Sequence, residues 1–395
     1  MRQAGAALTA VLLAAFACTA SAQPPGRWYK GDLHAHSTYS DGDSPVAQVL
    51  AGVTEKGLEF FALTDHDTYM DGKPKHWDDP AYASGIVTLL YGSEWTTPKG
   101  HANIWAPAKI AYDKLWTANQ NQDPAAAIAE AHSRGALFSI NHPVSLLNNW
   151  EYASFEGADS LEVWNATYRL PNLNGWAIHG LWDRLLQSRL RLAAVGGSDT
   201  HQLTGPESLV HGLGDPTTWV YAAEKTAEAI LGGIKAGRTS VSYAPNGPRL
   251  DFRADADGDG KFEALIGANL PLSGRQLTFR IDVVEQIPIA APRFGIVVEV
   301  PDGIVEMFRQ ETLSPLALLA LVRDGRLAGV FRNGRLWKAY LLLNGATSVV
   351  FRDKPEEPGY YRVELIGKPG VETVLEKLLY GRVLAITSPI YLGYQ

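Results

Sequence analysis

Residues 34–42 of the chain read His-Ala-His-Ser-Thr-Tyr-Ser-Asp-Gly, and this stretch decides how the rest of the sequence is interpreted. His34 and His36 are two residues apart, a spacing that places both side chains on one face of an extended strand. Asp199 and His201 repeat that spacing after another apolar run. One such pair is equally typical of a solvated strand edge, so a metal centre is indicated by the joint pattern of donors at successive strand ends.

Further candidate donors follow predicted strands in the first half of the chain. His66 follows an apolar run at 60–63, Glu94 follows the run at 86–91, and His142 follows the run at 137–140. His101 stands next to a short run at 102–105, and the alternative for it is a polar loop residue. In a βα barrel the carboxyl ends of the strands meet at one mouth, where active sites usually lie. Imidazole and carboxylate together favour Zn, Mn or Fe over Ca or Mg.

Helix and strand patterns alternate from Trp28 to about Tyr243. Ser44 as the N-cap and Pro45 as the first helical residue predict a helix that ends at Gly57, before a buried strand. Asp123-Pro124 opens an alanine-rich helix that ends at Gly135, and residues 174–189 carry another helical pattern. Repeated βα units predict a parallel sheet and, at this length, a barrel.

The sequence changes character after Tyr243. Residues 244–248 resemble a linker, and later β-branched and aromatic runs are broken by Asp324-Gly325 and Asn333-Gly334, which predict hairpins. Ten of the eleven tryptophans precede this change. We therefore expect a β-sandwich-like domain in residues 246–395, with one short helix at 371–380.

The first 22 residues have the pattern of a secretory signal peptide. Arg2 is followed by an apolar stretch at 8–17 and by a small-residue cleavage motif, Ala20-Ser21-Ala22. We expect a mature chain that begins at Gln23 and is exported to the periplasm or the extracellular space; the alternative is an uncleaved anchor. Cys18 is the only cysteine, so the mature chain would hold metal through nitrogen and oxygen alone.

Composition limits the partners that we expect. The chain has 42 acidic and 35 basic residues and a net charge of −7, which gives no electrostatic reason to expect nucleic acid. After the leader, no apolar run of about 20 residues predicts a membrane span. A small-molecule substrate is the partner that these features favour.

In their order along the chain, these motifs resemble those of the polymerase-and-histidinol-phosphatase (PHP) superfamily. The resemblance covers most of residues 28–243 and rests on residues 34–42, Thr64-Asp-His-Asp67, Gly92-Ser-Glu94, Gly100-His101, Asn141-His-Pro143 and Gly197-Ser-Asp-Thr-His201. It implies an α/β fold, a distorted seven-stranded (β/α) barrel in residues 23–245, followed by the smaller β-sandwich-like domain. It also implies up to three metal ions.

The resemblance also implies a role for each donor. His34, His36, Glu94 and Asp199 would hold one ion, with Glu94 bridging to a second ion bound by His101 and His142, and Asp41, His66 and His201 would hold a third. Asp65 and Asp67 would accept protons from ligand imidazoles, although both are equally typical of turn residues. No catalytic residue distinct from the ligands is expected.

A hydrolase that cleaves an ester is the function that this centre predicts, because a bound ion lowers the pKa of water and supplies a nucleophile at neutral pH. A phosphate mono- or diester is the favoured substrate. The leader, the β domain and the ending Ala385-Ile-Thr-Ser-Pro-Ile-Tyr391 resemble the carbaryl-hydrolase-like subgroup, so a carboxylic or carbamic aryl ester is the alternative. A non-catalytic surface-binding protein is the alternative from another class.

A smaller signal lies in the second domain. Asp255, Asp257, Asp259 and Gly260 match the first half of a calcium-binding loop. Position 12 of that loop is Ile266, so the bidentate glutamate is missing. A candidate calcium site and an acidic hairpin turn are both consistent with this stretch.

Overall fold

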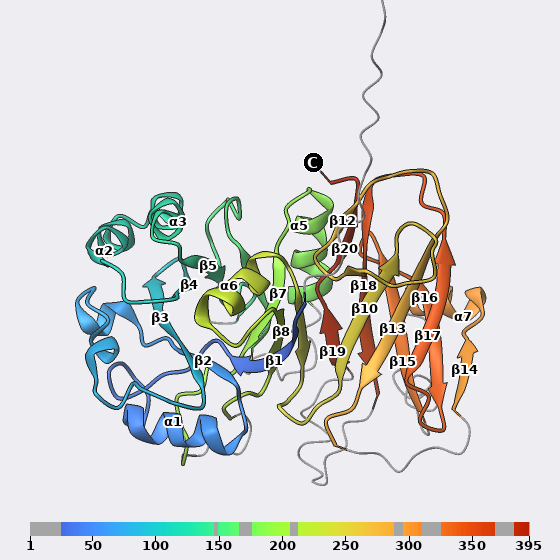
Figure 1. Cartoon of the computed structure of the whole chain (residues 1–395). Helices are drawn as coiled ribbons and strands as arrows, with labels where there is room; N and C mark the ends of the chain where they lie inside the picture. The colour runs from blue at the N-terminus through green and yellow to red at the C-terminus, as the bar shows by residue number, and fades with distance from the viewer. Residues whose placement is uncertain are drawn as a thin grey trace, which may run out of the picture.

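The computed structural model describes residues 25–145, 149–165, 176–205, 212–287, 295–309, 325–367 and 383–394. The chain forms two parts that lie side by side (Figure 1). The N-terminal part (residues 25–243) combines strands and helices, and the C-terminal part (residues 244–394) consists mainly of strands. The expected leader lies outside the described residues, so its cleavage stays a prediction.

One sheet organises the N-terminal part. Its strands pair in the order β9-β8-β1-β2-β3-β4-β5-β6-β7. Their bounds are β1 (Arg27–Asp32), β2 (Phe60–Leu63), β3 (Thr88–Thr97), β4 (Gly100–Ala106), β5 (Leu137–Ile140), β6 (Ser160–Asn165), β7 (Ala193–Gly197), β8 (Thr217–Ala222) and β9 (Thr239–Ser242). The two ends of this path come together, because the Thr218 hydroxyl accepts from the Gly196 N–H at 2.8 Å and the Thr239 hydroxyl donates to the Ala194 carbonyl at 2.7 Å. The expected count of seven barrel strands stays a prediction.

The direction of the strands is mixed. The pairs β1–β2, β2–β3, β5–β6 and β6–β7 are parallel, as the βα pattern predicts. The pairs β1–β8, β8–β9, β3–β4 and β4–β5 are antiparallel. Only Pro98 and Lys99 connect β3 to β4, and two residues suit a hairpin but are too few for a parallel crossover.

Helices cover the outside of this sheet (Figure 1). They are α1 (Val46–Glu55), α2 (Asp113–Gln120), α3 (Pro124–Ser133), α5 (Asp183–Gln187) and α6 (Ala227–Lys235), with 3₁₀ turns η1 (Asp67–Met70) and η2 (Lys75–Asp78) and a π-helical turn η4 (Trp176–Trp182). Asp123 caps α3 by accepting from the Ala126 N–H at 3.0 Å, as predicted. The predicted cap of α1 was displaced by one residue: Pro45 is the N-cap, and the Ser44 hydroxyl donates to Asp43 instead.

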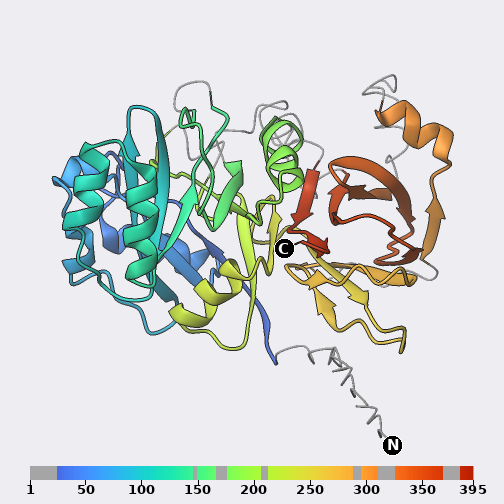
Figure 2. The same cartoon turned by 90° about the horizontal axis from the view of Figure 1, so that it is seen from above.

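The C-terminal part has two facing sheets, the sandwich-like arrangement that the sequence predicts (Figure 2). One sheet has the order β11-β10-β13-β17, and the other contributes β14-β16-β15-β18-β19. The bounds are β10 (Arg249–Asp255), β11 (Ala264–Leu265), β12 (Asn269–Leu270), β13 (Leu277–Val284), β14 (Ile296–Glu299), α7 (Asp302–Arg309), β15 (Gly325–Arg332), β16 (Arg335–Leu343), β17 (Ser348–Asp353), β18 (Gly359–Ile366), β19 (Val383–Thr387) and β20 (Ile390–Leu392).

One of the predicted hairpins is confirmed in detail. Arg332 pairs with Arg335 across a two-residue turn, and its central residues Asn333 and Gly334 have φ angles of 51° and 76°. Positive φ at both positions is the signature of the turn type that Asn-Gly favours. The helix predicted at 371–380 lies outside the described residues, as does Asp324.

The two parts share both a sheet and a core. Strand β19 pairs with β9 in antiparallel register, with Ala385 opposite Ser242. The Ser388 hydroxyl accepts from the Ala194 N–H of β7 at 2.8 Å. A single cluster of buried apolar residues contains Ile104 and Phe138 from the first part and Phe279 and Tyr391 from the second. The boundary expected near residue 245 therefore marks the change from mixed helices and strands to mainly strands, but the hydrophobic core continues across it.

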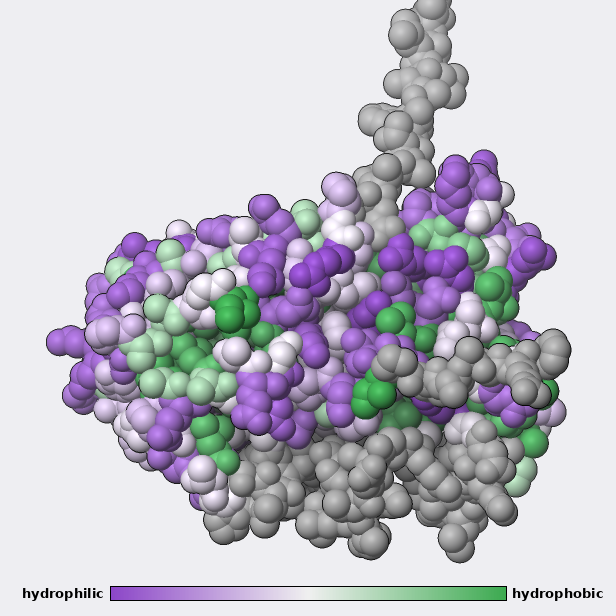
Figure 3. All heavy atoms as spheres, turned by 60° about the horizontal axis from the view of Figure 1, so that its bottom comes forward, coloured by the Kyte–Doolittle hydropathy of each residue, from purple (hydrophilic) through white to green (hydrophobic). Residues whose placement is uncertain are grey.

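The surface is mixed in character. On the face shown in Figure 3, hydrophilic residues cover much of both parts, and apolar residues gather in a patch on the N-terminal part. Among the described residues, no helix is both long and apolar enough to cross a membrane.

Candidate metal centre

The candidate donors converge from the ends of several strands. His34 and His36 follow β1, His66 follows β2, and Asp199 follows β7. His142 follows β5, with Asn141 between them. The sequence predicted this convergence, because parallel strands point their carboxyl ends at the same edge.

Two donors reach the centre differently from the prediction. Glu94 does not follow its strand but lies inside β3, which continues to Thr97. His101 lies in β4, opposite Thr96 across the β3–β4 hairpin, and is buried. The hairpin thus places a carboxylate and an imidazole from neighbouring strands at one site.

All nine predicted donors come together in overlapping groups of nitrogen and carboxylate atoms. Within each group the atoms lie within 4.8 Å of one another. The groups are His34, His36 and Glu94; His34, His142 and Asp199; His66, Glu94 and His101; and His36, Asp41, His66 and His201. His34, His36, His66 and Glu94 each belong to two groups, so the groups form one connected centre that could hold several ions.

The distances between donors are those expected around an ion. Two atoms bound tetrahedrally to one ion are about 3.4 Å apart when each bond is about 2.1 Å. The Nε2 atom of His34 lies 3.3 Å from both Glu94 Oε1 and Asp199 Oδ1. The Nε2 atom of His142 lies 3.4 Å from Glu94 Oε1, and that of His201 lies 3.3 Å from Asp41 Oδ1. Neighbouring donors therefore leave room for ions between them.

Three buried donor atoms make no hydrogen bond of normal geometry: His34 Nε2, Glu94 Oε2 and His101 Nδ1. Each lies within ion-pair distance of another donor, and Glu94 Oε2 lies 2.7 Å from His66 Nδ1. An unpaired polar atom buried in a protein costs about 1–3 kcal/mol, and more when it is charged. Three such atoms within one cluster fit a cation that completes their coordination. The residues present therefore fit a group of divalent ions.

The charges of the cluster are strongly coupled. Burial favours the neutral forms of Glu94 and Asp199, but the surrounding imidazoles outweigh it and hold the pKa of both carboxyls well below the usual range. Burial also acts against the charged form of His66, yet Glu94 and Asp41 raise its pKa to about 11. For His36, burial and the neighbouring imidazoles lower the pKa to about 4. Without an ion, the carboxylates thus hold protons on some imidazoles and not on others.

Two of the donors have unusual backbone conformations. The φ angle is 24° at His142 and 51° at Asp199, in the left-handed region that residues other than glycine rarely adopt. Such conformations cost about 1–3 kcal/mol and persist where surrounding contacts impose them. Here the Asp199 N–H donates to the His34 carbonyl at 2.8 Å, and the His142 N–H donates to Glu162 at 2.8 Å.

Glu162 is a residue of the centre that the sequence interpretation missed. Its Oε1 atom lies 3.0 Å from His34 Nδ1, and its Oε2 atom accepts from Asn165 at 2.9 Å. A carboxylate on the second ring nitrogen fixes the orientation and tautomer of a ligand imidazole. The available signal was a carboxylate inside the apolar run at 160–164, because an unpaired acidic side chain is rarely buried.

Asp65 and Asp67 do not act on the imidazoles in the predicted way. Asp65 accepts from the Ser40 hydroxyl at 2.6 Å, and that hydroxyl lies 3.3 Å from His36 Nδ1. The expected direct contact is thus replaced by one through Ser40. Asp67 accepts from the Thr96 N–H at 3.0 Å and from the Asn119 amide, so it holds loops together beside the centre.

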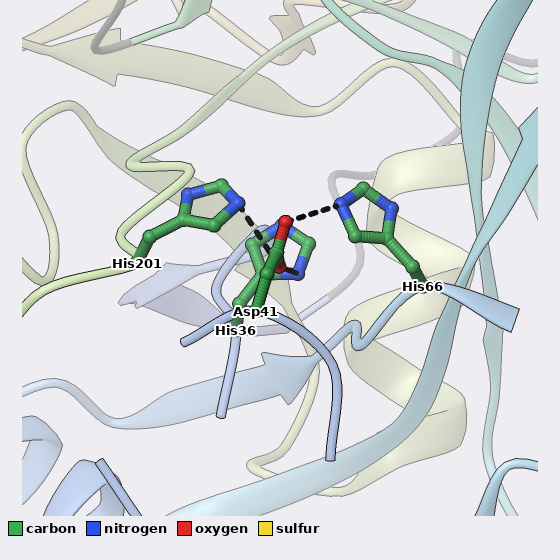
Figure 4. A group of neighbouring side chains, drawn as sticks. All are labelled: His36, Asp41, His66 and His201. Carbon is green, nitrogen blue, oxygen red and sulfur yellow. Dashed lines mark ion pairs between the residues drawn. The ribbon is translucent and has the colours of Figure 1, made fainter. Parts of the chain in front are cut away.

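The accessibility of the centre increases from one side to the other. The side chains of His34 and Glu94 are at most 1% exposed, whereas Asp41 is 34% and His201 is 27% exposed. Asp41 lies between His66 and His201, with His36 beside it (Figure 4). A substrate can therefore approach over Asp41 and His201.

The candidate calcium residues also come together. Asp255, Asp257 and Asp259 form a group with Glu263. Glu263 precedes Ile266, the residue at the position where a calcium-binding loop has its bidentate glutamate. Asp255 accepts from the Gly258 and Gly260 N–H groups, and Lys261 pairs with Asp259. These contacts are also those of an acidic turn, so a calcium ion stays a prediction.

The centre can be compared with known proteins. No family model matches the chain. Over 41 residues the chain is 44% identical to the DNA polymerase/3′-5′ exonuclease PolX of Bacillus subtilis, a match that covers 10% of this chain and 7% of that protein. Over 75 residues it is 32% identical to a protein of Thermotoga maritima named "Probable histidinol-phosphatase", covering 19% of this chain and 30% of that protein. The chain thus spans less than a third of these relatives.

A solved structure covers more of the chain at lower similarity. It is a two-domain protein from Bacteroides vulgatus, described as containing a predicted PHP-like metal-dependent phosphoesterase. It covers 94% of this chain and 96% of its own length, with 15% identity and a TM-score of 0.44. In its ordered motifs and its nine clustered donors the chain resembles the polymerase-and-histidinol-phosphatase superfamily, and the two short sequence matches agree with that resemblance.

Proposed function

We propose that this protein is an exported hydrolase that uses two or three divalent transition-metal ions to cleave a phosphate ester. The cluster of nine donors, three of whose buried atoms make no hydrogen bond of normal geometry, is the observation that carries the proposal. The names of the sequence relatives, a probable histidinol-phosphatase among them, agree with phosphate chemistry. Zn, Mn and Fe are the ions that this mixture of imidazole and carboxylate favours.

The donors have distinct tasks in this proposal. His34, His36, Glu94 and Asp199 would hold an ion at the buried end of the centre, and Asp41, His66 and His201 would hold one at the exposed end. An ion bound there lowers the pKa of water from about 15.7 towards about 7 and draws negative charge away from the ester oxygens.

Other residues of the chain keep these donors in place. The Glu162 carboxylate on His34 Nδ1 directs Nε2 into the cluster. Ser40, held by Asp65, does the same for His36. Because these contacts are made before substrate binds, the cluster does not have to reorganise during the reaction.

An exposed aromatic ring beside the centre favours an aryl ester. Tyr69 is 59% exposed, and its ring is stacked 5.7 Å from that of His66. It gives a flat leaving group a surface to pack against on the accessible side. The same surface would suit an aryl carbamate, so the choice between the two esters needs a direct assay.

The experiment is a substrate panel measured on protein loaded with Mn or Zn. We expect aryl phosphate hydrolysis to exceed hydrolysis of matched aryl phosphodiester, carboxylate and carbamate esters. His34→Ala should remove most of that activity, whereas His132→Ala, which alters an exposed imidazole paired with Asp159, should not. Faster turnover of the carbamate would instead favour the alternative, and wild-type turnover by His34→Ala would refute the assignment of the centre.

Tyr69→Ala tests the proposed aryl surface separately. We expect the KM for an aryl phosphate to rise several-fold, with little change for an alkyl phosphate of similar charge. Equal changes for both substrates would show that Tyr69 does not contact the leaving group.

Export is tested on the protein recovered from its source cells. The proposal predicts a mature chain that begins at Gln23 and is found outside the cytoplasm. An N-terminal peptide that retains residues 1–22, identified by mass spectrometry, would contradict it.

A further inference from the structure

A second pocket lies at the opposite end of β1 from the metal centre. It has a volume of about 650 Å³. Its walls come from both parts of the chain, since Arg27, Trp28 and Lys30 lie on β1, Trp219 on β8, and Arg249 and Arg253 on β10. Pockets of this size accommodate small organic ligands.

The pocket carries more positive than negative charge. Arg27 pairs with Glu59 at 2.7 Å. Arg253 takes both oxygens of Asp251, at 2.8 and 3.0 Å. Two cations stay without a carboxylate at hydrogen-bond distance: Lys30 donates to the Pro245 carbonyl, and Arg249 lies 3.6 Å from Asp251, which is already engaged.

Arg249 is the residue that points most directly to a ligand. It is only 7% exposed, and its buried Nη1 atom has no hydrogen-bond partner. Burial lowers its pKa to about 10, because desolvation outweighs the attraction of Asp251. A buried cation without a close counter-ion is costly, and an anion in the pocket would offset that cost.

Aromatic rings hold these cations in place. The Arg249 guanidinium lies over the Trp28 ring, 4.5 Å from its centroid, and Lys30 Nζ lies 5.9 Å from the centroid of Trp219. A guanidinium that packs its face on a ring presents its N–H edge to a ligand, and that edge matches the oxygens of phosphate.

We propose that this pocket binds an organic phosphate monoester at a site separate from the metal centre. The two cations without close carboxylates match the double negative charge of the phosphate, and the volume exceeds what inorganic phosphate would fill. Because the walls belong to both parts of the chain, the bound ligand links them and stabilises the folded protein. The proposal does not depend on the reaction at the metal centre.

The test uses phenylphosphonate, a dianion that cannot be hydrolysed as an ester, titrated into the full metal-loaded protein by calorimetry at pH 8. We expect a binding event at this pocket, distinct from any at the metal centre, that persists in His34→Ala and is weakened at least 10-fold in Arg249→Gln and in Lys30→Gln. Arg275→Gln, which removes an exposed arginine outside the pocket, is the matched control and should bind like the wild type.

The outcomes separate the alternatives. Benzoate should bind at least 10-fold more weakly than phenylphosphonate, and inorganic phosphate should bind more weakly as well. Both pocket variants should keep the wild-type rate of ester hydrolysis, since neither residue belongs to the centre. Unchanged phenylphosphonate affinity in a folded Lys30→Gln or Arg249→Gln protein, or loss of all binding in His34→Ala, would overturn the proposal.

Discussion

A buried ion pair between the two parts of the chain makes a strong prediction about stability. Arg362 on β18 is fully buried and contacts Asp183 of α5 at 2.6 Å through Nη2 and at 2.8 Å through Nε. Its third nitrogen contacts Glu364, which is also buried. Replacing Arg362 by Met therefore leaves two buried carboxylates with only the partly exposed imidazole of His179 within ion-pair distance.

The expected loss is about 3–5 kcal/mol in the free energy of unfolding, the usual cost of removing one partner from a buried pair. The attraction also has a pH signature. Burial alone would raise the pKa of Asp183, but Arg362 outweighs it and holds that pKa well below its ordinary value. The stabilisation is therefore complete above the unfolded-state pKa of about 3.9 and is lost as the pH falls below it.

The assay is urea denaturation at pH 7, followed by far-UV circular dichroism and by tryptophan fluorescence, which reports mainly on the N-terminal part. Lys109→Gln is the control, because it breaks an exposed pair with Asp78 and should cost at most about 1 kcal/mol. Replacing Asp183 and Glu364 by Leu together with Arg362→Met should restore much of the stability, since a packed apolar group avoids the desolvation cost. A loss below about 1 kcal/mol for Arg362→Met alone would refute the reasoning.

Four further predictions concern the metal centre. Elemental analysis of the purified protein should find two or three transition-metal ions per chain, because nine donors exceed the needs of one ion; at most one ion after reconstitution would contradict this. Glu162→Gln should weaken metal binding or activity about 10–100-fold while the fold persists. Calorimetric titration with Zn measures this affinity, and an unchanged value would contradict the role given to Glu162. Metal uptake by the stripped protein should strengthen between pH 7 and 9, since carboxylates overcome burial to raise the pKa of His201 to about 9, and the ion that His201 holds must displace that proton. A flat pH profile would refute this. A chain that ends at Pro245 keeps all nine donors and should bind metal, but its melting temperature should fall. A folded product without metal would show that the C-terminal part completes the centre.

Much of the centre was predictable from local sequence because its donors follow strands. The spacing of His34 and His36 places both on one face, and parallel strands carry their ends to a common edge. The cap at Asp123 and the turn at Asn333-Gly334 depend on the backbone preferences of a few neighbouring residues. Such features need no knowledge of distant parts of the chain.

Other features depend on contacts between distant segments and could not be predicted in that way. Glu162 lies next to His34, although 128 residues separate them. The pairing of β19 with β9 joins residues more than 140 positions apart, and neither strand carries a local sign of its partner. The position of Glu94 inside β3 was missed because the strand continues through polar residues to Thr97, which apolar periodicity does not mark.

These distant contacts explain how the centre keeps its strained backbone. Asp199 follows β7, and its left-handed φ is held by the hydrogen bond of its N–H to the His34 carbonyl. Strand β7 is in turn held from the C-terminal part, where Ser388 accepts from Ala194 and contacts Thr239 of β9 at 2.6 Å. The C-terminal part contributes none of the nine donors, yet it fixes the strand that presents Asp199. The C-terminal part therefore contributes to the centre by positioning Asp199. That contribution depends on the contact between the two parts, which the Arg362–Asp183 pair also stabilises.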